Sequence, residues 1–422
     1  MLSKMFVIKF FGFISSISLI TTCFEFKTTK FFWNVPSEKC FANKINIPLE
    51  KYGIISNNKQ QFHGNKIVLM YEKDVGLYPF IKNVNNTYIE FVNGGIPQKT
   101  NITAHLEKLR DDIERIIPNS KFDGPAIIDV EEWRPTYDSN WSSKRIYREA
   151  SIKYVLERYP NISRNDAMNV AKKEFDAAAL NFLLKTLKEC QYKRPYAKWG
   201  FYGFPICDEN GLDRNSTFCY PHHDDKLLDF LKYTDALYPT AYLYPGRSYA
   251  IKNMFVEDVL NETIRINDLI EKLGFQRKYI YVYHKFELNP YNEIIDNISF
   301  YDPYHLCITY KKSVEYGVDG LVIWSTSKNI YKRCNNIQKY VETQLGPYIQ
   351  SLGIFFDSCA NILTSNHGRC VLVREKKHLP VCNRYLKIEN FKPWCKSGFY
   401  GQHCEEFKYN STDGFPLPFQ LI

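Results

Sequence analysis

The chain has 422 residues, of which 45% are hydrophobic and 24% are charged. This length allows one large α/β domain with a small module beside it, and the composition excludes an intrinsically disordered chain. The formal net charge of +9 fits either plain solubility or attraction to a polyanion. Because the chain has no basic–aromatic motif of the kind that binds nucleic acids, nucleic acid is not the expected polyanion.

The first 25 residues have the pattern of a secretory signal peptide. Lys4 and Lys9 flank the start of an apolar run, and small residues follow near Thr21–Cys23. This pattern predicts a signal peptide over residues 1–25 that is removed near residues 22–27. A retained membrane anchor is the alternative, but the run is short and is interrupted by polar residues. No later segment has 18 consecutive apolar residues, so no other membrane span is expected.

Sequons and cysteines agree with a secreted, extracellular protein, with the lysosome as the alternative location. Glycosylation is predicted at eight N-x-S/T sequons, which are Asn85, Asn101, Asn140, Asn161, Asn215, Asn261, Asn297 and Asn410. The chain has twelve cysteines, and five of them follow position 358. This density predicts a disulfide-stapled C-terminal segment in an oxidising compartment.

Short apolar runs alternate with longer amphipathic stretches from residue 31 onward, which is typical of α/β proteins. The candidate strands are 31–36, 66–72, 125–133, 198–204, 236–243, 278–287 and 319–325. The candidate helices are 103–117, 143–158, 165–189, 252–273, 300–316 and 328–345. About seven strands with helical crossovers predict an irregular TIM-like (β/α) barrel. A doubly wound open sheet is the alternative, and it is disfavoured because no glycine-rich phosphate-binding motif follows the first strand.

The texture of the sequence changes after about residue 346. Leu345-Gly346-Pro347 is expected to end the last helix of the barrel. HGRC at 367–370 and CKSGFYGQHC at 395–404 have the spacing of an EGF-like module. The predicted domains are therefore a catalytic barrel over 26–348 and an EGF-like module with a C-terminal tail over 349–422.

The candidate strand at 125–133 runs into three carboxylates, and chemistry collects at strand ends in (β/α) barrels. Asp129 and Glu131 are two apart, so on a strand both side chains point to one face, with Cα atoms about 6–7 Å apart. Glu132 then points the other way. Two such carboxyl groups do not ionise easily together, so one keeps a proton that suits protonation of a glycosidic oxygen. The alternative is a structural ion pair with Arg134 or Lys144.

Other candidates are weaker. Many tyrosines and Trp324 stand near the predicted strand ends, where rings stack on sugar faces, although an aromatic residue on a strand is more often part of the core. The cluster at 222–225, HHDD, lacks the spacing of metal ligands and is expected to be a solvated loop. No metal and no cofactor are predicted.

The motifs carry a resemblance to a known family. AIIDVEEWRP resembles the IDxExWRP signature of the eukaryotic hyaluronidases, which are secreted, lysosomal and venom glycoside hydrolases. Further similar motifs are FFWNVPSEKC, KYGI at 52–55, NGGIPQ at 93–98, WGFYGFPIC at 199–207, YPTAY at 238–242 and GLVIWS at 320–325. They stand in the family's order over roughly residues 30–345.

The resemblance implies roles for individual residues. Glu131 would be the general acid/base, and Asp129 would share its proton and orient the substrate's acetamido group. Tyr202 and Tyr242 would hold that group, and Trp324 would close the −1 subsite. The acetamido carbonyl oxygen would attack the anomeric carbon, so no enzyme nucleophile is needed.

Two departures bear on substrate preference. Tyr71, a further expected substrate-binding residue, precedes Glu72 where some relatives have aspartate. The last strand continues as STSK at 325–328, where many members have small residues and then an acid.

The resemblance also implies disulfides. The expected pairs are Cys40–Cys334, Cys207–Cys219, Cys359–Cys370 and Cys395–Cys404. Cys190, Cys307 and Cys382 are left unassigned.

The sequence therefore predicts a secreted, monomeric endo-β-N-acetylhexosaminidase that acts on hyaluronan. Two rivals stay open, which are the same chemistry with chondroitin as preferred substrate and a non-catalytic glycosaminoglycan-binding protein.

Overall fold

The computed structural model describes residues 25–83, 89–209, 217–291, 300–373, 381–383 and 385–408. The predicted signal peptide lies almost entirely outside these residues, as do four sequons, Asn85, Asn215, Asn297 and Asn410. Among the described residues, no helix is long and apolar enough to cross a membrane.

Parallel strands form a TIM-barrel-like ring. Their spatial order is β2 (Ile54–Ser56), β1 (Lys30–Asn34), β10 (Gly320–Trp324), β9 (Tyr279–His284), β8 (Ala236–Leu237), β7 (Lys198–Phe201), β6 (Pro125–Asp129) and β3 (Val68–Tyr71). A parallel bridge between Tyr202 and Tyr238 joins the β7 edge to the β8 edge. Strands such as β6 and β10 are buried along almost their whole length, which is why they read as continuous apolar runs. The described ring has one strand more than the seven predicted, because β2 has only three residues.

The side chain of Asn57 spans the seam between β2 and β3, two strands that share no ladder in the described part of the chain. Its Nδ2 donates to the carbonyl oxygens of Ile67 at 2.9 Å, Gln61 at 3.0 Å and Phe62 at 3.2 Å. Its Oδ1 accepts from the amides of Lys66 at 2.9 Å and Ile67 at 3.2 Å. Where the two edges meet, one buried side-chain amide thus makes the hydrogen bonds to backbone groups that a neighbouring strand makes elsewhere.

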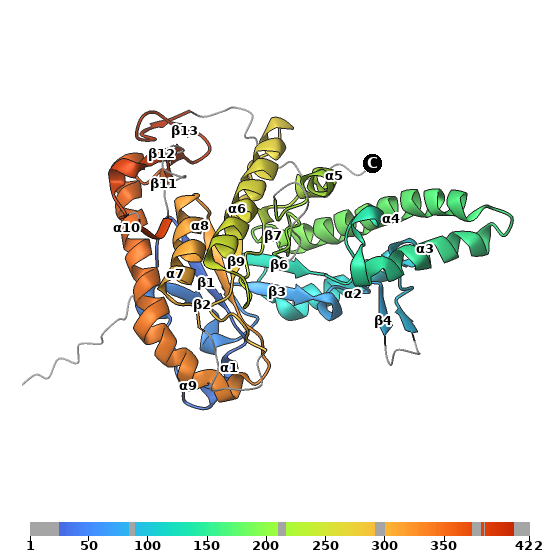
Figure 1. The fold of residues 1–422 in the computed structure, drawn as a ribbon, viewed down its shortest axis with the longest axis horizontal. Coiled ribbons are helices and arrows are strands. Elements are labelled where there is room, and N and C mark those ends of the chain that lie inside the picture. Colours follow the sequence, from blue (N-terminus) through green and yellow to red (C-terminus); the bar gives the residue numbers. More distant parts are fainter. Residues whose placement is uncertain are drawn as a thin grey trace, which may run out of the picture.

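Helices surround the ring (Figure 1). They are α1 (Glu38–Ala42), α2 (Ile102–Ile116), α3 (Arg145–Arg158), α4 (Arg164–Lys193), α5 (Pro221–Leu231), α6 (Tyr249–Lys272), α7 (Pro303–Leu306), α8 (Lys312–Glu315), α9 (Ile330–Tyr340) and α10 (Gly346–Thr364). A π-helical turn, η8 (Cys307–Lys311), joins α7 to α8. Helices α3 and α4 lie side by side and project from the barrel as an arm, near the antiparallel hairpin of β4 (Phe80–Asn83) and β5 (Ile89–Val92).

The segment at 222–225 is not a solvated loop, so that prediction is wrong. It forms the first turn of α5, where Pro221 supplies a preset φ at the helix start. His223 and Asp224 are buried, and Asp224 Oδ1 accepts a hydrogen bond from the amide of Ile206 at 2.7 Å. The polar cluster therefore anchors the chain that follows β7.

The last barrel helix does not end at Leu345-Gly346-Pro347, which corrects the predicted boundary. Helix α9 continues through a π-helical turn, η9 (Val341–Leu345), into α10. The wider turn accommodates Pro347, whose nitrogen has no hydrogen to donate. Gly346 serves close packing, since a Cβ there would stand 2.3 Å from the ring of Tyr52.

The C-terminal segment packs on the barrel beside the end of α10 (Figure 1). Strands β11 (Gly368–Leu372) and β12 (Phe391–Cys395) pair antiparallel, as do β13 (Phe399–Tyr400) and β14 (Glu406–Phe407). Arg369 bonds Asp319 at 2.5 Å and the Gly317 carbonyl at 2.7 Å, and the Arg277 guanidinium lies 4.2 Å from the Trp394 ring centre.

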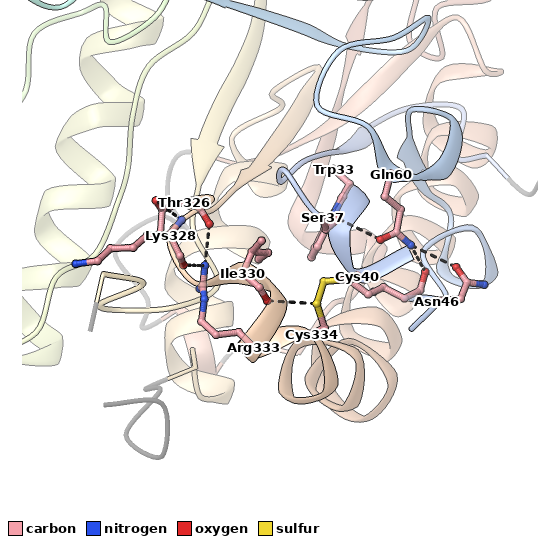
Figure 2. The surroundings of a disulfide bond; sticks show 11 residues. Trp33, Ser37, Cys40, Asn46, Gln60, Thr326, Lys328, Ile330, Arg333 and Cys334 are labelled. Atoms are coloured by element: carbon pink, nitrogen blue, oxygen red, sulfur yellow. Dashed lines mark hydrogen bonds between the residues drawn. A yellow bond between two sulfur atoms is a disulfide. The ribbon is translucent and has the colours of Figure 1, made fainter. Parts of the chain in front are cut away.

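The disulfides that the resemblance implies are present. Figure 2 shows Cys40, at α1, bonded to Cys334 of α9, and the other three are Cys207–Cys219, Cys359–Cys370 and Cys395–Cys404. A fifth joins Cys307 to Cys382, both left unassigned from the sequence. Cys190 on α4 is buried and free.

One predicted glycosylation site is inconsistent with the fold. Asn140 is fully buried, and its Nδ2 donates to the carbonyls of Thr136 and Arg134 at 2.8 and 3.0 Å. An amide committed in this way has neither space nor a free N–H for a glycan. Three other sequons, Asn101, Asn161 and Asn261, are exposed.

Candidate active site

The strand ends enclose a pocket of about 590 Å³. All six residues predicted to act on substrate line it, and they are Tyr71, Asp129, Glu131, Tyr202, Tyr242 and Trp324. Tyr71, Asp129 and Trp324 are the last residues of β3, β6 and β10, and Tyr202 directly follows β7. Because the strands are parallel, these ends open on one face of the barrel.

Asp129 and Glu131 lie together, although not on one strand as predicted. β6 ends at Asp129, which is only 4% exposed, whereas Glu131 follows the strand and is exposed within the pocket. A side-chain hydrogen bond joins the two carboxyl groups. The Glu131 amide donates to Glu72 Oε1 at 3.2 Å, which fixes the backbone beyond the strand.

Both carboxyl groups hold protons more tightly than usual. Burial raises the pKa of Asp129 well above its ordinary value, and the nearby charge of Glu131 adds to the effect. Enclosure by protein raises the pKa of Glu131 as well, with a further contribution from Glu72. A pair of this kind retains a proton at a pH where isolated carboxyl groups have lost theirs.

A structural ion pair does not explain these carboxylates. Lys144 donates to the backbone carbonyls of Glu131 and Glu132, the latter at 3.1 Å. The Arg134 guanidinium lies 4.3 Å from the ring centre of Trp141. Within the described ranges neither cation forms a salt bridge with either carboxylate of the pair.

Glu132 faces away from the pocket, as the alternation of side chains predicted. Its carboxylate accepts a hydrogen bond from the hydroxyl of Tyr147 at 3.4 Å.

Stacked rings form the pocket wall. Trp324 stacks on Tyr242 with ring centres 5.8 Å apart, and its Nε1 donates to the Tyr71 hydroxyl at 3.3 Å. Tyr71 in turn stacks on Phe62 at 5.7 Å. Burial raises the pKa of Tyr202 and of Tyr242, so both phenols stay protonated and can donate hydrogen bonds.

A buried ion pair holds the loop that follows β10, and no pattern in the sequence predicted it. Arg333 Nη1 lies 2.7 Å from both carboxylate oxygens of Glu287, and Ser325 Oγ donates to the same carboxylate at 2.6 Å. Arg333 Nη2 also donates to the Thr326 carbonyl at 2.7 Å, as Figure 2 shows. Residues 325–327 line the pocket. The network therefore holds in place the segment 325–328, whose sequence differs from that of many family members.

Sequence reasoning also missed Lys285 and Tyr244, which line the same pocket. The Lys285 ammonium lies 3.9 Å from the Tyr244 ring centre and donates to the Leu288 carbonyl at 3.3 Å. Burial lowers the pKa of this lysine to about 8. The strand-end rule missed Lys285 because the predicted strand 278–287 extends three residues beyond β9, which ends at His284.

A second pocket of about 230 Å³ adjoins the first. Both are lined by Glu131, Tyr202, Tyr242 and Tyr244, so Glu131 lies where two stretches of one groove meet, and Asp129 lines the larger of them. In the described part of the chain, no group of three or more histidine, cysteine, aspartate or glutamate side chains is placed to hold a metal ion.

Comparison with known proteins agrees with this geometry. The sequence pattern of the family described as hyaluronidase matches residues 20–404. A chondroitin hydrolase of Caenorhabditis elegans is 33% identical over 384 residues, which cover 88% of this chain and 79% of that protein. Hyaluronidase-1 of Cerastes cerastes is 28% identical over 419 residues, which cover 89% of this chain and 90% of that protein.

A solved structure is similar as well. The crystal structure of bee venom hyaluronidase in complex with a hyaluronic acid tetramer superposes with a TM-score of 0.70 at 28% identity, over 77% of this chain and 99% of that chain. Since the family pattern covers most of the chain, this chain belongs to the hyaluronidase family of glycoside hydrolases.

Proposed function

We propose that the chain is a secreted endo-β-N-acetylhexosaminidase that hydrolyses the β-1,4 linkages of hyaluronan with retention of configuration. The observation that carries the proposal is the hydrogen-bonded pair of Asp129 and Glu131 within an aromatic groove. Besides the pair, the described lining contains Glu38 in the larger pocket and Asp208 and Glu209 in the smaller one, and none of the three is among the charges that most affect the pKa of Glu131. We therefore assign no carboxylate of the protein as a nucleophile about 5 Å from the acid.

In the proposed reaction the substrate supplies its own nucleophile. Glu131 donates its proton to the glycosidic oxygen while the acetamido carbonyl oxygen attacks the anomeric carbon, and the leaving sugar departs as an alcohol. Asp129 holds the acetamido group, with Tyr202 and Tyr242 as hydrogen-bond donors to it. Glu131, now a carboxylate, takes a proton from water as that water attacks the anomeric carbon and opens the cyclic intermediate.

The shape of the groove supports internal cleavage of a polymer. Sugar units on either side of the cut bond have room in the two adjoining pockets, and Trp324 and Tyr71 offer flat faces for stacking. An enzyme that trims chain ends needs a closed pocket instead.

Chondroitin is the second candidate substrate, favoured by the Caenorhabditis elegans relative that is named a chondroitin hydrolase. N-acetylgalactosamine differs from N-acetylglucosamine in the configuration of one hydroxyl group, so the same residues serve both polymers. Product sizing after separate incubation with purified hyaluronan and with chondroitin distinguishes the two.

The Glu131→Gln variant tests the catalytic role. We expect hydrolysis to fall by about 10³-fold or more, because the amide cannot give its proton to the leaving oxygen, while polymer binding is retained. Glu38→Gln is the matched control in the same pocket and is expected to keep activity. Near-normal hydrolysis by Glu131→Gln would rule out the mechanism, and an inactive wild-type chain that still binds polymer would favour a non-catalytic glycosaminoglycan-binding protein.

Three further proposals concern the rest of the chain. Five disulfides favour secretion into an oxidising compartment. The C-terminal bridges Cys359–Cys370 and Cys395–Cys404 support an EGF-like module. The exposed sequons Asn101, Asn161 and Asn261 are the proposed glycosylation sites of the described chain.

A further inference from the structure

We propose that Lys285 binds the carboxylate of the substrate's uronate unit and so selects an acidic polymer over a neutral one. This inference rests on the proposed function and deepens it. The acid pair and its tyrosines recognise an N-acetylhexosamine, and a neutral polymer of N-acetylglucosamine carries that unit too. Selection of a glycosaminoglycan needs a group that reads the negative charge of the neighbouring sugar.

Lys285 has the right place for that role. It follows β9 directly and lines the larger pocket together with Asp129, Glu131 and Trp324. Its side chain is packed against Tyr242 and Tyr244, whose ring centres lie 5.4 and 3.9 Å from the ammonium nitrogen. Only 2% of the residue is exposed, so the surrounding side chains restrict the position of the ammonium group.

The ammonium group has bonding capacity to spare. Its one described hydrogen-bond acceptor is the carbonyl of Leu288 at 3.3 Å, although an ammonium group has three donors. Glu209 and Glu287 are the opposite charges that act on the pKa of Lys285, and neither forms a salt bridge with it. Glu287 is already committed to Arg333 at 2.7 Å.

The balance of charge in the larger pocket favours this role for Lys285. The described lining of that pocket contains three acidic residues, Glu38, Asp129 and Glu131, and Lys285 as its one basic residue, whereas Arg134 and Lys144 line the smaller pocket. A uronate carboxylate entering this pocket meets repulsion from the acidic side chains. A charge-assisted hydrogen bond from a desolvated ammonium offsets that repulsion and is stronger than the same contact in water.

The test compares two lysine variants on two polymers with full-length protein. Lys285→Met removes the charge and keeps the length of the side chain, and Lys285→Arg keeps the charge. Lys332→Met removes an exposed lysine of α9 and is the matched control for net charge. The polymers are hyaluronan and hyaluronan whose carboxyl groups have been reduced to alcohols, or chondroitin and its reduced form if chondroitin is the polymer that is cleaved.

We expect the KM of Lys285→Met for the acidic polymer to rise about tenfold with kcat near that of wild type. On the carboxyl-reduced polymer, Lys285→Met and wild type should have the same KM, because the group that the lysine reads is gone. Lys285→Arg should recover most of the loss, and Lys332→Met should match wild type on both polymers.

Two outcomes overturn the inference. The first is an unchanged KM of Lys285→Met for the acidic polymer. The second is an equal loss on both polymers, which indicates that Lys285 only supports the fold of the pocket. A wild-type chain that cleaves neither hyaluronan nor chondroitin would instead overturn the proposed function, and with it this inference.

Discussion

Asp129 and Glu131 form a site whose chemistry costs stability. Enclosure by protein raises the pKa of both carboxyl groups in the folded protein, and nearby negative charge adds to the effect, from Glu131 on Asp129 and from Glu72 on Glu131. A carboxyl group whose pKa is raised by folding stabilises the fold below its unfolded pKa, and this advantage is lost as the pH rises through the folded value. At neutral pH the pair therefore opposes folding.

A stability measurement on the same Glu131→Gln variant follows from this sign. At neutral pH the variant should unfold at a higher temperature than wild type, because it lacks a carboxyl group whose pKa folding raises and whose presence therefore disfavours the folded state at that pH. At about pH 3.5, where carboxyl groups are largely protonated in both states, the difference should shrink. Thermal unfolding followed by circular dichroism at both pH values tests this, and a variant that is less stable than wild type at neutral pH contradicts it.

The acidic residues of the site could be predicted from the sequence, whereas its supporting contacts could not. Asp129 and Glu131 directly follow an apolar run, a local pattern that needs no partner to be noticed. The ion pair of Glu287 and Arg333 joins residues 46 positions apart, and nothing in the local sequence relates them. Asn140 was misread for a similar reason, since a sequon does not reveal that its amide is buried against the chain around it.

Among the secondary-structure elements, a short strand, the start of one helix and the continuation of α9 into α10 were not predicted. β2 has three residues, too few for a periodic pattern to emerge. The α5 start was misread because His222 and the residues after it look polar, although the helix buries part of that polar face. Gly346-Pro347 read as a helix end because glycine and proline usually stop a helix, but a π-helical turn carried the chain through.

The seam between β2 and β3 gives a prediction at the scale of these elements. Asn57→Ala should lower the free energy of unfolding by about 2–4 kcal/mol, because several buried backbone groups lose their partner at once. Asn58→Ala changes an exposed neighbour and should stay within about 0.5 kcal/mol of wild type. Urea unfolding measures both, and equal stabilities for the two variants would mean that the seam does not depend on the amide.

For the whole molecule, the barrel architecture followed from the alternation of strands and helices, and the order of the chain fixed which ends meet. The division into two units at residue 348 was less well founded. One helical path from Ile330 to Thr364 crosses that boundary, and Cys307–Cys382 ties the C-terminal segment back to the barrel. A change of texture in a sequence marks a change of composition, and it does not show that the two parts are mechanically separate.

The net charge of +9 yields a prediction at the same scale. If the positive excess attracts the polyanion, KM for hyaluronan should rise several-fold between about 50 and 200 mM salt, because each released counterion adds to the salt dependence. Steady-state assays over this range test it, with carboxyl-reduced polymer as the control that should respond weakly. A KM that is independent of salt would assign the charge to solubility alone.

Cys190 can report transient local opening of the folded protein. It is the free cysteine of the described chain, it is buried on α4, and burial raises the pKa of its thiol. A thiol reagent in native buffer therefore reacts with it only when α4 separates from its neighbours. The labelling rate measures how often this opening occurs in the absence of denaturant. A lower rate after polymer is added would show that binding in the groove stabilises the side of the barrel that α4 covers.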